Sequence, residues 1–309
     1  MTVVLWVKSK QLDNLSLKQR HREALERALP GSRFIYCESR EQFLEALPEA
    51  EAASSWLFKP QWFERAARLK LLVSPAAGRE FFPAEAPAGV RLEFSGFHGT
   101  IMAETVLGMM LSHARRLLQA ARLQTELPWP RRELEPGQRL FRGSKVTVLG
   151  FGHIGEQIGR LVKALGARIT GLRRNPGSRP DYFGVEDRLL PAERLDELLP
   201  GTDHLAVCLP ATAETSGILD ARRLELLPEE AGIYNVGRGN ALDEQALAEL
   251  LRRRPLCEAY LDVFREEPLP AASPLRPLPN CLILPHVSAH APEYMDLFVE
   301  ELIGLLRRG

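Results

Sequence analysis

The sequence has no excess of charge of either sign. Its 309 residues include 40 lysines and arginines and 40 aspartates and glutamates, so the formal net charge is zero. A protein that binds nucleic acid or an anionic membrane through its surface field needs a concentration of basic residues, and this balance gives no sign of one. The composition therefore favours a small-molecule partner.

Long apolar runs and paired cysteines are also missing. No run approaches the length of a transmembrane helix, and Met1–Lys8 lacks the basic start and long apolar stretch of a signal peptide. The four cysteines, Cys37, Cys208, Cys257 and Cys281, show no C-x-x-C spacing. These absences predict a cytoplasmic protein with reduced core thiols and no metal site.

The chain is long enough for two hydrophobic cores, since single cores seldom grow beyond about 250–300 residues. The first hundred or so residues alternate apolar runs with helical segments. Strands are predicted at 3–7, 33–36, 55–58, 71–73 and 90–94, with helices from about Ser16, Glu41 and Gln61. This alternation is typical of a small parallel α/β sheet.

The loop Ser74–Arg79 follows one of these predicted strands. Open α/β sheets bind ligands at such strand ends, and the small residues of the loop would leave backbone amides free for a carboxylate. A plain turn is an equally good interpretation of the spacing.

The most informative stretch is 145–155, where an apolar run breaks into Gly150, Gly152 and Gly155 and then resumes with helical periodicity until Gly166. A second apolar run, 168–172, follows. In a βαβ unit such glycines allow the turn, the approach of a pyrophosphate and the packing of helix on strand. The pattern predicts a dinucleotide site, and a glycine turn kept for packing alone is the alternative.

The remaining chain supports a second doubly wound sheet. An apolar helical stretch at 101–123 and a Pro- and Arg-rich arm at 127–143 precede the glycine motif. After it come predicted strands at 204–208, 232–236, 258–263 and 281–284, and a predicted helix at 244–252.

Three strand ends carry an arginine, acids and a histidine: 235–239 with Arg238, 262–270 with Glu267, and 284–289 with His286. The carboxyl ends of parallel strands share one edge, so these side chains can converge on one crevice. Each residue alone also has a non-functional interpretation, such as a solvated charge or a structural histidine.

These residues resemble the D-isomer-specific 2-hydroxyacid dehydrogenase family, which includes glyoxylate/hydroxypyruvate reductases and phosphoglycerate dehydrogenases. The resemblance covers roughly residues 100 to 290, while the N-terminal part is similar in pattern and in Ala77-Gly78. The matching motifs, in chain order, are 150–155, 235–239, 243–244, 261–264, 267–270, 273–275, 279–280 and 285–286.

The resemblance implies reduction of a small 2-keto acid of the glyoxylate or hydroxypyruvate type to the D-2-hydroxy acid. His286 would donate a proton to the carbonyl oxygen, and Glu267 would hold it oriented and charged. Arg238 would bind the substrate carboxylate and polarise the carbonyl. The amides of Ala77 and Gly78 would complete carboxylate binding from the other domain, which requires the cleft to close.

The resemblance also implies a nicotinamide cofactor. Where enzymes that use NAD keep an acid for the ribose, this sequence has Arg173 and Arg174. Two guanidinium groups suit a 2′-phosphate, so NADP is the expected cofactor, with NAD possible. The implied cofactor-binding residues are Gly150, Gly152, His153, Ile154, Gly155, Arg173, Arg174, Leu209, Pro210, Thr215, Val236, Gly237, Arg238 and Asp262.

The expected architecture has two doubly wound parallel-sheet domains. Residues 1–98 plus about 288–309 would form a flavodoxin-like substrate domain, and 99–287 an NAD(P)-binding Rossmann domain. The long helix and the arm are expected to form a homodimer, in which Trp129 could reach a neighbour's site. His98 and His290 are weaker candidates for the acid, because neither lies in the Pro-His context of the family.

Two other functions remain possible. The same fold serves nucleotide-sensing corepressors, although no basic or interaction tail favours that role here. A Rossmann methyltransferase also uses a glycine turn, but it leaves Arg238, Glu267 and His286 unexplained.

Overall fold

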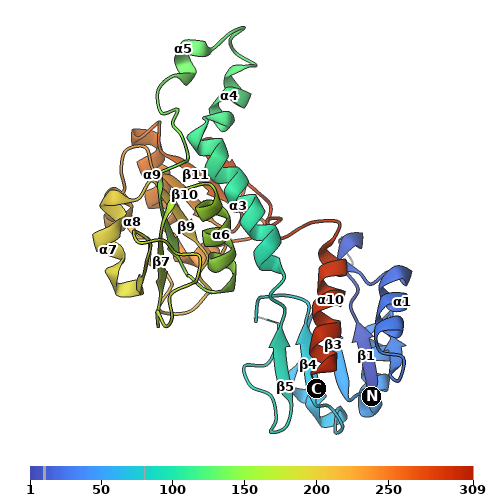
Figure 1. Ribbon diagram of the computed structural model, residues 1–309. Helices are drawn as coiled ribbons and strands as arrows, with labels where there is room; N and C mark the ends of the chain where they lie inside the picture. The colour runs from blue at the N-terminus through green and yellow to red at the C-terminus, as the bar shows by residue number, and fades with distance from the viewer. Residues whose placement is uncertain (10–11, 80, 309) are drawn as a thin grey trace. The chain divides into compact units, whose positions relative to one another are not determined.

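The computed structural model describes residues 1–9, 12–79 and 81–308. The chain divides into two compact units (Figure 1): unit 1 is Met1–His98 with His290–Gly309, and unit 2 is Gly99–Ala289. Residues 10, 11, 80 and 309, which belong to the predicted substrate domain, lie outside the described residues. Each unit is built on one parallel sheet.

Unit 1 contains a five-stranded sheet in the order β2-β1-β3-β4-β5, which is the order of flavodoxin-like folds. Among the described residues of this unit the α-helices are α1, α2 and α10, and α1 packs beside α10 at the end of the chain. The elements are β1 (Thr2–Trp6), α1 (Gln19–Ala28), β2 (Arg33–Tyr36), α2 (Arg40–Ala46), β3 (Ala52–Ser55), β4 (Leu71–Ser74), β5 (Arg91–Phe94) and α10 (Tyr294–Arg307).

Two predictions in unit 1 were wrong. The strand expected at 55–58 is β3, Ala52–Ser55, and the segment expected to be a helix from Gln61 is a 3-10 helix, Pro60–Arg65. Alanine and serine have little preference for strands, but β3 lies between β1 and β4 and hydrogen-bonds on both sides. Tertiary pairing therefore overrides local propensity here.

Unit 2 contains a seven-stranded sheet in the order β12-β11-β10-β9-β6-β7-β8. The order reverses between β6 and β9, as in a doubly wound Rossmann sheet, and the predicted fold class is confirmed. The strands are β6 (Lys145–Leu149), β7 (Arg168–Arg173), β8 (Arg188–Pro191), β9 (His204–Val207), β10 (Gly232–Asn235), β11 (Glu258–Leu261) and β12 (Cys281–Ile283). The main helices are α3 (His98–Ala114, whose first residue belongs to unit 1), α4 (Leu117–Leu123), α6 (His153–Ala164) and α9 (Glu244–Arg253), with short α5 (Arg131–Leu134), α7 (Leu195–Leu198) and α8 (Ala221–Glu225).

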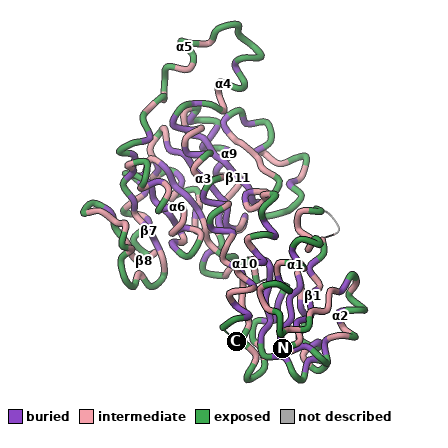
Figure 2. Tube along the Cα trace, turned by 45° about the vertical axis from the view of Figure 1, so that its right-hand side comes forward, coloured by how far each residue is buried: buried purple, intermediate pink, exposed green. Residues whose placement is uncertain are grey.

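Both faces of the unit 2 sheet are covered, and Figure 2 shows its interior as buried. Alternate residues of β10 join different cores: Ile233 packs with α7, α8 and α9, and Tyr234 packs with α3 and α6. Because a strand buried on both faces has no solvent side, its sequence is a continuous apolar run. This is why these strands could be recognised by apolar length alone.

The helical stretch expected at 101–123 is broken. Helix α3 ends at Ala114, and Arg116 adopts a left-handed backbone conformation (φ 55°) before α4 begins at Leu117. A left-handed residue other than glycine is strained unless its surroundings hold it. The contacts of the Arg116 side chain supply that support.

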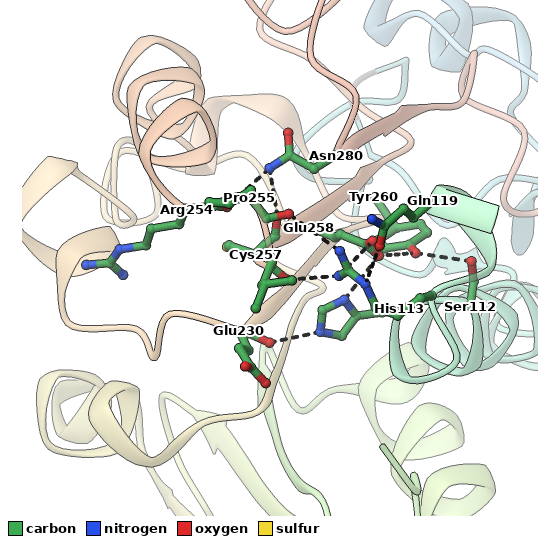
Figure 3. Close-up of polar contacts among 12 residues, drawn as sticks. Ser112, His113, Gln119, Glu230, Arg254, Pro255, Cys257, Glu258, Tyr260 and Asn280 are labelled. Atoms are coloured by element: carbon green, nitrogen blue, oxygen red, sulfur yellow. Dashed lines mark hydrogen bonds and ion pairs between the residues drawn. The ribbon is translucent and has the colours of Figure 1, made fainter. Parts of the chain in front are cut away.

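Arg116 is fixed by a buried polar cluster at the start of β11, in which Figure 3 labels His113, Glu258 and Tyr260. Its guanidinium lies 2.9 Å from the Glu258 carboxylate, which also contacts His113 Nδ1 at 3.1 Å and accepts a 2.6 Å hydrogen bond from the Tyr260 hydroxyl. Arg116 also donates to the Leu256 carbonyl at 3.0 Å. With Glu258 only 1% exposed, these bonds replace the water it has lost, and they tie the base of the arm to the sheet.

The Pro- and Arg-rich arm was expected to have no helical period, and it contains only the short helix α5. Figure 1 shows α4 and α5 extending beyond the end of the unit 2 sheet. Trp129 is 82% exposed and Leu140 is 75% exposed on this arm. Both side chains would be buried if the arm packed against another surface.

The cysteines are free, as expected, and Cys37 and Cys257 are buried. Burial raises the pKa of the Cys37 thiol to about 11 and that of Cys257 to about 12, so both remain protonated at neutral pH. Within the described residues, no helix is long and apolar enough to cross a membrane.

Candidate functional site

The glycine turn lies where the strand order of unit 2 reverses. β6 pairs with β7 on one side and with β9 on the other, and α6 begins immediately after Gly152. Gly150 has φ 96°, and a side chain there would meet the Cys208 carbonyl oxygen at 2.7 Å. The turn after β6 and the chain after β9 are therefore in direct contact at the switch point, where doubly wound sheets bind their ligands.

The residues expected around the nucleotide after β9 form a tight loop. The Thr215 hydroxyl donates to the Pro210 carbonyl at 2.6 Å and accepts from the Thr212 amide at 2.9 Å. Thr215 is 9% exposed, so its hydroxyl serves mainly to shape the loop that follows Leu209. A direct bond from Thr215 to a cofactor stays a prediction.

Arg173 is the last residue of β7, and Arg174 follows it at the carboxyl edge of the sheet. Arg174 is exposed, whereas Arg173 is partly buried and its Nε has no hydrogen-bond partner among the described residues. The pKa of Glu214 is lowered first by a hydrogen bond from Thr212 and further by the charge of Arg174, so Arg174 lies near the loop after β9. Two cationic groups thus stand at the end of the strand where a ribose is expected.

Arg238 is held in a turn after β10. The buried Asn235 side chain accepts from the Gly237 amide at 3.1 Å and donates to the Arg238 carbonyl at 3.1 Å. Gly239 packs against the chain after β11, where an added side chain would collide with the Phe264 carbonyl carbon at 1.9 Å. Asn235 and Gly239 thereby bring the Arg238 turn against the segment that leads to Glu267.

His286 and Glu267, which follow two different strands, are in contact, as the family resemblance implied. His286 Nδ1 lies 2.7 Å from Glu267 Oε2, and Glu267 Oε1 accepts from the Phe264 amide at 2.9 Å. Because an ionised carboxylate only accepts hydrogen bonds, Nδ1 carries the hydrogen in this contact. The His286 side chain is 53% exposed, so Nε2 remains the nitrogen that can exchange a proton with a ligand.

Asp262 has a role that the sequence did not reveal. Its fully buried carboxylate accepts from the amides of Val287 at 2.7 Å and Ser288 at 3.1 Å, and its carbonyl accepts from the His286 amide at 3.0 Å. These bonds hold His286 at φ 56°, a left-handed conformation that few residues other than glycine adopt. The contact of Asp262 with a nicotinamide carboxamide stays a prediction.

Ala77 and Gly78 lie in unit 1, in the loop after β4. Ala77 is exposed and Gly78 is partly buried. Within the described part of the chain, neither amide donates to a protein acceptor, whereas the Ala76 amide donates to Ser74 Oγ at 3.1 Å. Two adjacent unused amides at a strand end are suited to an anion.

The other histidines considered as acids belong to the other unit of the chain. His98 and His290 both belong to unit 1, and His98 is 4% exposed with its ring nitrogens against Ser95 and Tyr294. In the described ranges, no group of three or more His, Cys, Asp or Glu side chains is placed to hold a metal ion.

The strand reversal, the glycine turn and the His-Glu pair define a dinucleotide-binding protein with an acid-base group at the same sheet edge. A family model for the NAD-binding domain of D-isomer specific 2-hydroxyacid dehydrogenases matches residues 107–288. The chain belongs to this family, whose members are oxidoreductases that act on CH-OH groups.

Individual relatives agree with that assignment. The chain is 30% identical to a glyoxylate reductase of Thermococcus onnurineus over 81% of its own length and 77% of the relative's. It is also 30% identical to D-3-phosphoglycerate dehydrogenase of Methanocaldococcus jannaschii over 88% of its length, but spans only 52% of that protein. A crystal structure of a family member from Xanthobacter autotrophicus Py2 in complex with NADPH and MES superimposes with a TM-score of 0.80 at 30% identity, covering 100% of this chain and 95% of that one.

Two alanine substitutions in the glycine turn test separately its contribution to folding and its contribution to dinucleotide binding. A side chain at Gly152 meets no protein atom within 4 Å, whereas one at Gly155 would lie 2.5 Å from the Gly150 carbonyl oxygen. Gly152→Ala is therefore expected to keep the melting temperature and to weaken NADPH binding by at least about tenfold. Gly155→Ala is expected to lower the melting temperature by several degrees, about what 1–3 kcal/mol of strain produces. Thermal unfolding and NADPH fluorescence titration measure the two effects; wild-type affinity in Gly152→Ala would argue against a dinucleotide at this turn.

Proposed function

We propose that the protein reduces a small 2-keto acid, of the glyoxylate or hydroxypyruvate type, to the D-2-hydroxy acid with NADPH. The observation that carries this proposal is the 2.7 Å contact of His286 with Glu267 beside the Arg238 turn. The similarity to a glyoxylate reductase supports the substrate class. When bound, the nicotinamide supplies the hydride.

In this proposal the chain's own residues place the keto acid and move one proton. Glu267 holds the Nδ1 hydrogen of His286, so that Nε2 is directed to the substrate and can protonate the carbonyl oxygen. Arg238 binds the carboxylate and polarises the carbonyl through its planar fork of donors. The amides of Ala77 and Gly78 bind the carboxylate as well.

The cofactor assignment to NADP rests on Arg173 and Arg174. The Nε of Arg173 has no partner in the described structure, and the space beside Gly152 is open to a phosphate, so the residues present fit a phosphorylated dinucleotide. The Xanthobacter relative was crystallised with NADPH. A preference for NADH over NADPH would contradict this assignment.

Replacement of His286 tests the reaction. His286→Ala is expected to lower kcat for glyoxylate or hydroxypyruvate by about 10²–10⁴-fold, because the proton donor is lost, with NADPH affinity little changed. His290→Ala, which removes the alternative acid, is expected to keep kcat within about threefold. Steady-state kinetics over a panel of 2-keto acids measures both variants.

Two results would contradict the reaction. Full activity in His286→Ala would exclude this mechanism. A wild-type chain that binds NADPH but turns over no keto acid in the panel would favour the nucleotide-sensing binding protein instead.

Arginine substitutions at both ends of β7 test the preference for NADPH over NADH. Arg173→Ala and Arg174→Ala are each expected to raise KM for NADPH by about 10 to 100-fold, because each removes a charge-assisted contact to the 2′-phosphate, and to change KM for NADH little. Arg168→Ala is the matched control, since Arg168 begins the same strand and pairs with Glu186 at 3.1 Å. A wild-type kcat/KM much higher with NADH than with NADPH would refute the assignment.

The protein is proposed to be a homodimer through α3 and the arm. Trp129 and Leu140, exposed at 82% and 75%, offer the arm apolar side chains that a subunit interface would bury, and the buried Arg116 cluster gives the arm a rigid base. Light scattering is expected to give twice the mass of the chain, and Trp129→Ser with Leu140→Ser is expected to shift it towards the monomer. A monomeric wild-type mass would contradict the proposal.

A further inference from the structure

Tyr294 begins helix α10 and is almost completely buried, with 4% of its surface exposed. Three rings surround it: Phe97 with centroids 4.8 Å apart in a T-shaped arrangement, His98 at 5.2 Å and Trp56 at 6.0 Å. All four residues belong to unit 1. An aromatic ring confined in this way cannot turn freely, so its hydroxyl has a fixed position.

The Tyr294 hydroxyl has two polar contacts. It donates to the Pro75 carbonyl at 3.1 Å and lies 2.6 Å from His98 Nε2. His98 Nδ1 in turn contacts the Ser95 carbonyl at 3.1 Å, and because a carbonyl only accepts, Nδ1 carries a hydrogen there. Since the Tyr294 hydroxyl has one hydrogen, its bond to Pro75 requires that His98 donates from Nε2 as well as from Nδ1. A buried chain of hydrogen bonds then runs from Ser95 through His98 and Tyr294 to Pro75.

Pro75 is the second residue of the loop that contains Ala77 and Gly78. The loop begins at Ser74, which is fully buried and whose carbonyl accepts from the Ser95 amide at 3.1 Å. Burial raises the pKa of the Tyr294 hydroxyl, so it keeps its hydrogen and stays a donor at neutral pH. Beyond Ala76, the described structure shows no hydrogen bond from the Ala77 or Gly78 amide, so the contacts on either side of them set their placement. These are the bonds at 74–76 and, on the other side, the Arg79 carbonyl, which accepts from the Phe82 amide at 3.1 Å.

We propose that Tyr294, supported by His98, is a positioning residue for substrate binding: its bond to the Pro75 carbonyl sets the orientation of the Ala77 and Gly78 amides that receive the carboxylate. The inference rests on the proposed function of that loop. In this proposal His98 supports the Tyr294 hydroxyl and is not the catalytic acid. Tyr294 itself does not touch the substrate.

The test compares Tyr294→Phe with Tyr36→Phe in the full chain. Tyr36 is the matched control, because its hydroxyl donates to the Arg22 carbonyl at 3.2 Å in the same unit but far along the chain from the loop. Tyr294→Phe keeps the ring and removes only the hydroxyl. It is expected to raise KM for the keto acid by about tenfold, with kcat changed less than about threefold and KM for NADPH unchanged, whereas Tyr36→Phe changes none of them.

Hydrogen-deuterium exchange gives a second measurement that does not depend on activity. Amides of the peptide spanning 75–79 are expected to exchange faster in Tyr294→Phe than in the wild type and in Tyr36→Phe. Unchanged exchange in this peptide overturns the positioning role, whatever the kinetics. Faster exchange with an unchanged KM for the keto acid also overturns it, because the loop would then not hold the carboxylate.

The two failures can be told apart. If the wild type reduces no 2-keto acid, the proposed function fails, and the exchange experiment still decides whether Tyr294 orders the loop. If the wild type is active and Tyr294→Phe matches it in both KM and exchange, the function stands and the positioning role is rejected.

Discussion

The carboxyl edge of the unit 2 sheet depends on the buried carboxylate of Asp262. It is fully buried and binds the amides of Val287 and Ser288, and this keeps His286 in a left-handed backbone conformation. An acid that is taken out of water is costly unless its hydrogen bonds are replaced, and two amides at 2.7 and 3.1 Å do this. The hydrogen bonds of Asp262 thereby orient the His286 backbone so that the His286 side chain meets Glu267.

A comparable arrangement supports the loop of unit 1. There the fixed group is a tyrosine hydroxyl rather than a carboxylate, and it is held by aromatic rings and by His98. In both units a buried polar side chain binds the backbone that carries proposed contact residues. Such groups are difficult to find from sequence, because nothing in the neighbouring residues of Asp262 or Tyr294 indicates which distant amide or carbonyl they meet.

The sequence predicted six of the seven strands of unit 2 and missed β8. It also misjudged β3, the segment from Gln61 and the stretch 101–123. Strands buried on both faces are continuous apolar runs, so β9, β10 and β11 were visible without any structure. β3 was misplaced because Ala52–Ser55 has weak strand propensity, and the break at Arg116 was missed because the residues on both sides favour a helix. In each case a partner distant in sequence decided the outcome: the strands on either side of β3, and Glu258 for Arg116.

By itself, the sequence determined the family, the two parallel sheets and the identity of the residues at the strand ends, because hydrophobic period and glycine spacing are local properties of the chain. It could also name Arg238, Glu267 and His286 as candidates, since the ends of parallel strands share one edge. Only the tertiary structure decided that Glu267 meets Nδ1 of His286, that Asp262 serves the His286 backbone, and that Tyr294 holds Pro75. Those contacts join residues 19 to 219 positions apart, and no local pattern encodes which of many distant polar groups will meet.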